Sequence, residues 1–210
     1  MDVARRRTDE VYQRLRAEII RGDLRPREAL SEIEIAERLH VSRTPVRESL
    51  QRLDSEGLIT SHRRRWIVYE HTTDEIREIY EVRTALEGYS ARLACRRATD
   101  AELAGLAELR TEAANADLES DKRIDLNEHL HDSILRLAHN ETLLKQARTS
   151  RLFFFNRGVA RLYTPADLRV SAQQHELLLD AVCRRDAAGA EQAAREHIEY
   201  ALELILRKLH

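Results

Sequence analysis

Apolar residues recur every three or four positions near the start of the chain, as they do on one face of an α-helix. Tyr12, Leu15 and Ile19 form such a stripe in a helix predicted over residues 8–21. A second stripe follows Ser31, a residue suited to capping the N-terminus of a helix. Two short amphipathic helices are therefore expected in this part of the chain.

A third helix is predicted immediately afterwards, and it has a proline in its first turn. Pro45 lacks an amide hydrogen, and the first amides of a helix have no partner within the helix, so the helix can begin here. A residue before proline avoids the α region, which predicts Thr44 as the cap and Pro45 as the first helical residue. Val46, Leu50 and Leu53 form the apolar stripe, which should face the two preceding helices.

Two short β-prone runs, residues 58–60 and 66–69, follow and flank an arginine cluster at 63–65. The rest of the chain returns to helical spacing. Its predicted helices span residues 73–97, 99–118, 122–139, 141–161, 165–184 and 187–208. Short connections favour an antiparallel bundle. The expected fold is mainly α: a winged helix-turn-helix over residues 1–70, followed by an all-helical antiparallel bundle of about six helices over residues 71–210.

The composition is that of a globular protein, with 42% hydrophobic and 34% charged residues among 210. No apolar run approaches the roughly 18 residues of a membrane span, and no secretory signal is visible. Cys95 and Cys183 lie far apart and form no CxxC pair, which favours free thiols in a reducing compartment. We therefore expect a cytoplasmic protein without a membrane partner.

Charge alone does not identify a partner. The net charge is −2, and residues 1–70 carry 15 arginines against 13 acidic residues. The preference for arginine extends over the whole chain, which has 32 Arg and 3 Lys, so it does not by itself indicate nucleic-acid binding.

The positions of Arg43 and Arg47 are more informative than the charge. They flank Pro45 at the leading end of the third helix, where guanidinium groups can reach phosphates and base edges in a major groove. The alternative is a pair of surface arginines, with Arg47 bound to Glu48 or Asp54. Three short helices followed by a hairpin with a basic tip favour DNA binding.

The stretch LSEIEIAERLHVSRTPVRESLQRLDSEGLI, residues 30–59, closely resembles the winged helix-turn-helix of the GntR family of bacterial transcription regulators. EIREIYEVRTALEGYSARLA, residues 75–94, resembles the start of the helical ligand domain of the FadR-like branch, the FCD domain. This resemblance implies a homodimer that binds palindromic double-stranded operator DNA and responds to a small metabolite.

The resemblance also implies roles for individual residues. Arg43 and Arg47 become the recognition-helix contacts, and Thr44 becomes a contact to the DNA backbone. Arg63 and Arg64 would lie in the wing, although the wing lacks the glycine that many relatives have at its tip. Ile33 stands where many relatives carry a DNA-contacting arginine.

Histidines in the bundle form a candidate metal site. His131 shares a helical face with Asn127, whereas His129, two positions away, should point to solvent. His175 and His197 are equidistant from the predicted turn between the last two helices, so they should face each other across an antiparallel hairpin. Three inward imidazoles can bind a divalent ion such as zinc. The alternative is that each is a hydrogen-bonded core histidine.

The FCD resemblance supports the metal interpretation. Many FCD domains bind a metal through an Asp or Asn and three histidines, and Asn127, His131, His175 and His197 match those positions. A neutral amide oxygen binds a cation more weakly than a carboxylate, so Asn127 is the weakest of the expected ligands. Zinc is the favoured ion, with nickel or manganese as alternatives.

Arg83 and Tyr80 are the candidate effector-binding residues. Arg83 is expected either to form a surface pair with Glu87, one turn away, or to point inward and bind the carboxylate of an effector, as the resemblance suggests. We therefore expect a metabolite-responsive repressor rather than an enzyme. The alternatives are a metal-dependent hydrolase and a regulator that senses the metal itself. HELLL at 175–179 lacks the second histidine of the HExxH motif, which counts against the hydrolase.

Overall fold

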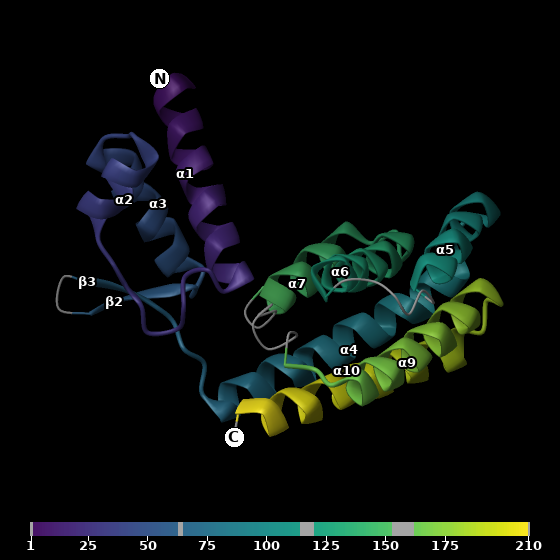
Figure 1. Ribbon diagram of the computed structural model, residues 1–210. Coiled ribbons are helices and arrows are strands. Elements are labelled where there is room, and N and C mark those ends of the chain that lie inside the picture. The colour runs from purple at the N-terminus through teal and green to yellow at the C-terminus, as the bar shows by residue number, and fades with distance from the viewer. Residues whose placement is uncertain (1, 63–64, 114–119, 153–161, 210) are drawn as a thin grey trace. The chain divides into compact units, whose positions relative to one another are not determined.

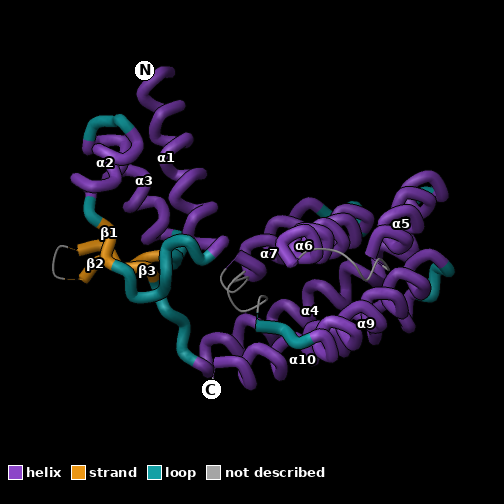
Figure 2. Tube along the Cα trace, viewed as in Figure 1, coloured by secondary structure: helices purple, strands orange, loops and turns teal. Residues whose placement is uncertain are grey.

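The structure is a computed structural model that describes residues 2–62, 65–113, 120–152 and 162–209 (Figures 1 and 2). The chain divides into two compact units, Met1–Thr72 and Thr73–His210. None of the helices in the described part of the chain combines the length and the apolar character that a membrane span requires.

The N-terminal unit contains three helices and a small antiparallel sheet. Its elements are α1 (Asp2–Arg21), β1 (Ala29–Leu30), α2 (Glu32–Leu39), α3 (Arg43–Ser55), β2 (Ile59–His62) and β3 (Arg65–Val68). The strand order is β1-β3-β2, with Ile59 opposite Val68 and Leu30 opposite Trp66. The hairpin β2–β3 was predicted, but β1 was not, because two residues are too few to show an alternating pattern.

The predicted apolar stripes form the core of this unit. Leu15 of α1 and Val46, Leu50 and Leu53 of α3 are all fully buried. The predicted start of α3 was wrong: the cap is Ser42, and the helix begins at Arg43 rather than at Pro45. Proline is accepted at the third helical position for the same reason as at the first, since amides of the whole first turn lack a partner within the helix.

Helix α1 also begins earlier than predicted, at Asp2 rather than near Thr8. Residues 2–7 contain neither proline nor glycine, and alanine and arginine are good helix formers, so the helix extends beyond its packed segment. At its other end α1 stops before Gly22, whose φ of 77° is a conformation that glycine adopts without strain.

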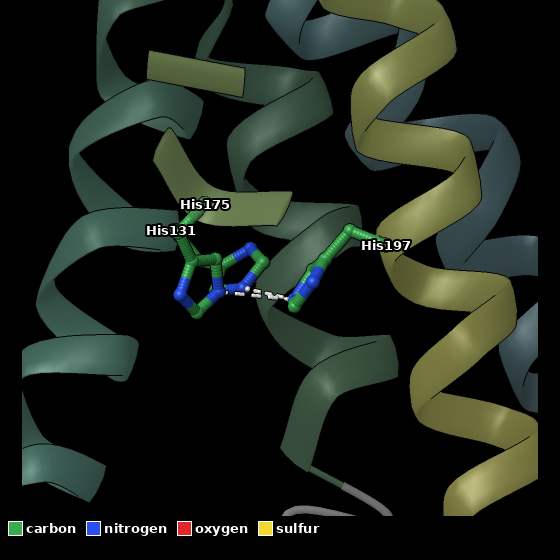
Figure 3. A group of neighbouring side chains, drawn as sticks. All are labelled: His131, His175 and His197. Carbon is green, nitrogen blue, oxygen red and sulfur yellow. Dashed lines mark hydrogen bonds between the residues drawn. The ribbon is translucent and has the colours of Figure 1, made fainter. Parts of the chain in front are cut away.

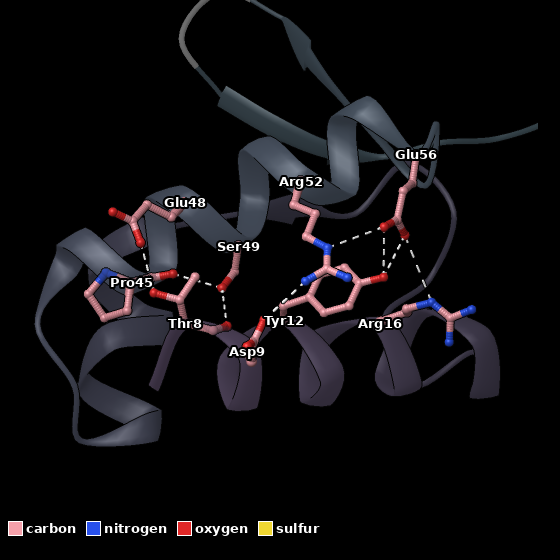
Figure 4. A network of polar contacts seen from close by, with 9 residues as sticks. All are labelled: Thr8, Asp9, Tyr12, Arg16, Pro45, Glu48, Ser49, Arg52 and Glu56. Carbon is pink, nitrogen blue, oxygen red and sulfur yellow. Dashed lines mark hydrogen bonds and ion pairs between the residues drawn. The ribbon is translucent and has the colours of Figure 1, made fainter. Parts of the chain in front are cut away.

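A network of polar contacts joins α1 to α3 (Figure 4). The hydroxyl of Tyr12 donates to both carboxylate oxygens of Glu56, at 2.8 and 2.7 Å. The guanidinium of Arg52 lies 3.6 Å from the centre of the Tyr12 ring. Ser49, which is fully buried, donates to the carbonyl of Thr8 at 2.9 Å. These contacts fix the orientation of α3 on the helix that supports it.

The described residues of the second unit form helices joined by short loops and include no strand. Its elements are α4 (Thr73–Arg97), α5 (Asp100–Ala113), α6 (Ser120–Leu137), α7 (Glu141–Leu152), α9 (Pro165–Cys183) and α10 (Ala187–Leu209). Helix α4 runs alongside α10 and also contacts α6, α7 and α9, so it is the central helix of the bundle (Figure 1). The predicted helix ends at 118 and 161 lie outside the described residues.

Local signals explain several helix boundaries. Thr99 and Glu102 form a capping box at the start of α5. Thr164 and Asp167 form another at α9, with Pro165 in the first turn. The turn between α9 and α10 holds Arg185 at a φ of 58°. Its side chain donates to Asp100 at 2.7 Å and to the carbonyl of Cys95 at 3.2 Å, which ties this turn to α4 and α5.

Candidate nucleic-acid interface and candidate metal centre

The leading end of α3 presents two arginines to solvent. Arg43 is the first residue of the helix and Arg47 lies one turn later, and their side chains are 58% and 54% exposed. Thr44 is also exposed. The buried residues of α3 face α1 and α2, so this edge of the helix is exposed within the described part of the N-terminal unit.

Both arginines contact a single carboxylate, that of Glu32 at the start of α2. Arg47 donates from Nε at 3.0 Å and from Nη2 at 2.8 Å, and Arg43 donates from Nη2 at 3.2 Å. Trp66 of β3 adds a contact from Nε1 at 3.4 Å. The hydrogen bonds from Arg47, with a smaller contribution from Arg43, lower the pKa of Glu32 to about 2. The surface-arginine alternative paired Arg47 with Glu48 or Asp54, and that pairing was wrong because the partner is Glu32.

The wing is described only in part. Strands β2 and β3 are paired as far as His62 and Arg65, both of which are exposed. Arg63 and Arg64, the predicted wing contacts, lie outside the described residues. Ile33, in the first turn of α2, is 53% exposed, an unusual value for a large apolar side chain.

The second cluster of functional side chains lies inside the bundle. His131 of α6, His175 of α9 and His197 of α10 are all buried, and their rings point toward one another (Figure 3). Nε2 of His197 lies 3.2 Å from Nε2 of His131 and 3.1 Å from Nε2 of His175. One ring nitrogen from each histidine lies within 4.8 Å of the others. Two of these residues come from the α9–α10 hairpin, whose turn places them at the same height.

Hydrogen bonds to the outer nitrogens determine how these rings present Nε2. Nδ1 of His131 lies 2.9 Å from Oε2 of Glu87, and a carboxylate only accepts hydrogen bonds, so Nδ1 of His131 carries a proton. Nδ1 of His197 lies 3.2 Å from Oε1 of Gln174, an amide oxygen that accepts hydrogen bonds, which favours the tautomer with the proton on Nδ1. The neutral forms of both rings then have a lone pair on Nε2.

This arrangement suits a cation. Two unprotonated Nε2 atoms 3.2 Å apart repel each other unless positive charge, a proton or a metal ion, lies between them. Ligands about 2.0–2.1 Å from a zinc ion are separated by roughly 2.9–3.4 Å in tetrahedral or octahedral geometry, which matches both short Nε2 distances. The residues present therefore fit a divalent metal.

Asn127 and His129 occupy the positions that the helical spacing predicted. His129 is exposed. Asn127 is half-buried and lies one turn before His131 on α6. Its coordination of a metal stays a prediction.

Arg83 points into the bundle, so the alternative of a surface pair with Glu87 was wrong about the location. Arg83 and Glu87 do pair, with Nε of Arg83 3.0 Å from Oε1 of Glu87, but both side chains are buried. The guanidinium also lies 4.4 Å from the centre of the Tyr80 ring, which is buried as well. Glu87 thus links Arg83 to His131 through its two oxygens.

A small cavity adjoins this link. Glu87 and His131 supply its polar wall, and its volume is that of about one water molecule. The rest of the lining is apolar and comes from Ile134, Leu135, Leu178, Ala194 and Ile198. The cavity therefore adjoins His131 of the histidine cluster and Glu87, the carboxylate that pairs with Arg83.

Comparison with known proteins agrees with this arrangement. Residues 7–68 match the family described as "Bacterial regulatory proteins, gntR family", and residues 78–200 match the FCD domain. The chain belongs to the GntR family. Within this family it combines the N-terminal helix-turn-helix with an FCD domain, as the sequence resemblance indicated.

Relatives align with this GntR-family protein over nearly their whole length. It is 35% identical over 191 residues to the Nta operon transcriptional regulator of Aminobacter aminovorans. That alignment covers 86% of this chain and 88% of the relative. It is 28% identical to the galactonate operon transcriptional repressor of Escherichia coli strain K12, covering 90% and 92%. The solved structure of E. coli McbR/YncC has a TM-score of 0.83 at 26% identity and covers 97% and 99%.

These similarities make the chain a DNA-binding transcriptional regulator. The relatives are named as regulators rather than as enzymes, which removes the support for a helical hydrolase. They also confirm the fold class of a winged helix-turn-helix plus a helical domain.

Two functional candidates escaped the sequence analysis. The sequence analysis did not single out Glu32, and it considered Glu87 only as a surface partner of Arg83. Each carboxylate contacts side chains of other elements: Glu32 contacts side chains of α3 and β3, and Glu87 contacts a side chain of α6. An acidic residue one turn from a predicted inward arginine is the one signal that pointed to Glu87.

Proposed function

We propose that this GntR-family regulator binds operator DNA as a homodimer and that its FCD domain binds a divalent metal together with a small carboxylate effector. The observation that carries this proposal is the convergence of three buried imidazoles beside the buried pair of Arg83 and Glu87. The effector would alter operator affinity by favouring one arrangement of the two DNA-binding units.

The metal part of the proposal rests on the donor set. His131, His175 and His197 supply three nitrogen ligands, Asn127 is the candidate oxygen ligand, and zinc is the favoured ion. Nickel and manganese are the alternatives. Three imidazole ligands leave coordination positions for an external oxygen, as a carboxylate effector requires.

The effector part rests on charge and position. A carboxylate in the cavity beside His131 would compete with Glu87, which lines the cavity, for the buried guanidinium of Arg83. The cavity holds about one water molecule, so a larger acid has to displace the surrounding side chains. That displacement would give the effector different affinities for two conformations, which is the requirement for allosteric control. One relative is named for the galactonate operon, and galactonate is a carboxylate.

The DNA part assigns base contacts to Arg43 and Arg47 and a backbone contact to Thr44, all exposed at the start of α3. Arg63 and Arg64 would contact the flanking phosphates from the wing. A homodimer would read two half-sites about one helical turn apart. The name of the galactonate operon relative supports a repressor.

Two experiments test the proposal. One measures metal content, and the other measures binding to a DNA duplex that the protein selects from random sequences. Metal content is measured for the wild type and for His131→Ala, His175→Ala and His197→Ala, with His129→Ala as the matched control because that histidine is exposed on the same helix as His131. We expect about one ion per chain in the wild type and the control and much less in the three variants.

The same duplex is then titrated with a panel of small carboxylates, using metal-loaded and chelator-stripped protein. We expect an acid that changes DNA affinity in the loaded protein only. A response to the metal but to no acid would indicate a metal-sensing regulator instead. An equal response in stripped protein would remove the metal from the sensor.

A further inference from the structure

We propose that Glu32 is a specificity-determining residue, which holds Arg43 and Arg47 in position for base edges and weakens their attraction to phosphates. The inference rests on the proposed role of these arginines in DNA binding. Glu32 itself is not exposed and is not among the residues expected to contact DNA.

The first argument is the way in which three elements converge on one side chain. Glu32 of α2 accepts from Arg43 and Arg47 of α3 and from Trp66 of β3. Its side chain is 16% exposed, whereas both arginines are more than half exposed. The carboxylate therefore lies beneath the guanidinium groups and keeps them on the outer surface of the unit.

The second argument concerns which donors are engaged. Arg47 binds Glu32 through Nε and Nη2, one edge of its guanidinium. A guanidinium has five N–H donors, so donors on Nη1 remain for a further acceptor. The O6 and N7 atoms of guanine are neutral acceptors, and Arg47 can approach them without giving up its bond to Glu32.

The third argument is electrostatic. Attraction to phosphates is independent of sequence and grows with each positive charge that the protein presents. The charge of Glu32 neutralises part of the charge of the two arginines and repels a nearby phosphate. Non-specific binding should therefore be weakened more than binding to base edges. The bonds to Glu32 also order the two long side chains before DNA arrives, which reduces the entropy lost on binding.

Glu34 provides a matched control. It lies in the same first turn of α2, two residues after Glu32, and it is exposed. Glu34→Gln removes the same charge from the same helix end as Glu32→Gln. A role of Glu32 limited to the helix dipole or to net charge would give both variants the same phenotype.

The experiment measures the dissociation constants of full-length protein for the selected operator duplex and for a scrambled duplex of the same length, at several salt concentrations. For Glu32→Gln we expect scrambled-duplex affinity to rise roughly 3- to 10-fold with little change for the operator. The salt dependence on the scrambled duplex should steepen by about 0.9 per additional phosphate neutralised. Glu34→Gln should leave the ratio of the two affinities near the wild-type value.

Thermal melting shows whether Glu32→Gln folds as well as the wild type. If it does not, Glu32→Asp provides a second test. The aspartate retains the charge, so it should retain more of the discrimination than glutamine does. Equal behaviour of Glu32→Gln and Glu34→Gln, or an unchanged affinity ratio in Glu32→Gln, would overturn the inference. Failure of the proposed function is a separate result: in that case Arg47→Ala leaves the operator affinity of the otherwise wild-type protein unchanged.

Discussion

Oε2 of Glu87 on α4 lies 2.9 Å from Nδ1 of His131 on α6, while Oε1 of the same carboxylate lies 3.0 Å from Nε of Arg83. A single buried carboxylate thus orients one of the three clustered imidazoles and pairs with the candidate effector arginine. Carboxylates that accept a hydrogen bond from a ligating histidine hold its ring in place and raise its basicity. Any group that competes for Arg83 would also disturb His131.

Glu87→Gln tests this link. We expect metal affinity to fall about 10- to 100-fold, because an amide binds and polarises the imidazole less well than a carboxylate does. Competition with a coloured chelator measures the change, and Glu81→Gln, exposed on the same helix, is the control. An affinity within threefold of the wild type would show that Glu87 does not position the ligand.

His197→Ala should have the largest effect on metal-dependent stability, because Nε2 of His197 is close to both other Nε2 atoms. With free metal at about 100 times its dissociation constant, the wild type should gain about 2.7 kcal/mol in its free energy of unfolding. Thermal or chemical denaturation with and without metal measures this gain. It should vanish in His197→Ala and persist in His129→Ala; persistence in both would rule out the triad as the site.

Arg47→Ala should reduce discrimination between the operator and a sequence with one altered half-site base pair by about 1–3 kcal/mol. The reason is the loss of a guanidinium that can form two hydrogen bonds with one base. Arg21→Ala, an exposed arginine at the end of α1, is the control. Full retention of specificity in Arg47→Ala would contradict the assignment of α3 as the reading helix.

The carboxyl group of Glu32 should titrate far below the ordinary value of 4.5, since the pKa is lowered to about 2. A pKa that is lower in the folded than in the unfolded state stabilises the fold above about pH 4.5, and this contribution is lost as the pH falls toward 2. The arginines are half exposed, so screening by solvent keeps the contribution small.

NMR of the glutamate side-chain carboxyl carbons measures this titration directly in the DNA-free protein. Glu32→Gln should remove the low-pKa resonance. A resonance of Glu32 that titrates near 4.5 would mean that the arginines do not occupy the carboxylate in solution.

Spacing along single helices was enough to predict much of this protein. The stripes of Leu15, Val46 and Leu50 identified the core faces of α1 and α3. The equal distances of His175 and His197 from their turn anticipated that they would meet. These inferences succeed because the 3.6-residue period and the symmetry of a hairpin are properties of the local chain.

Only the tertiary structure decided the contacts between elements that are distant in sequence. Glu32 meets Arg47 because α2 begins beside the start of α3, and Glu87 meets His131 because α4 packs against α6. The strand β1 exists only because β3 lies beside it. Periodicity states which face of a helix is buried, but the partner that a polar group finds on that face depends on how the helices pack, and that is a property of the folded chain as a whole.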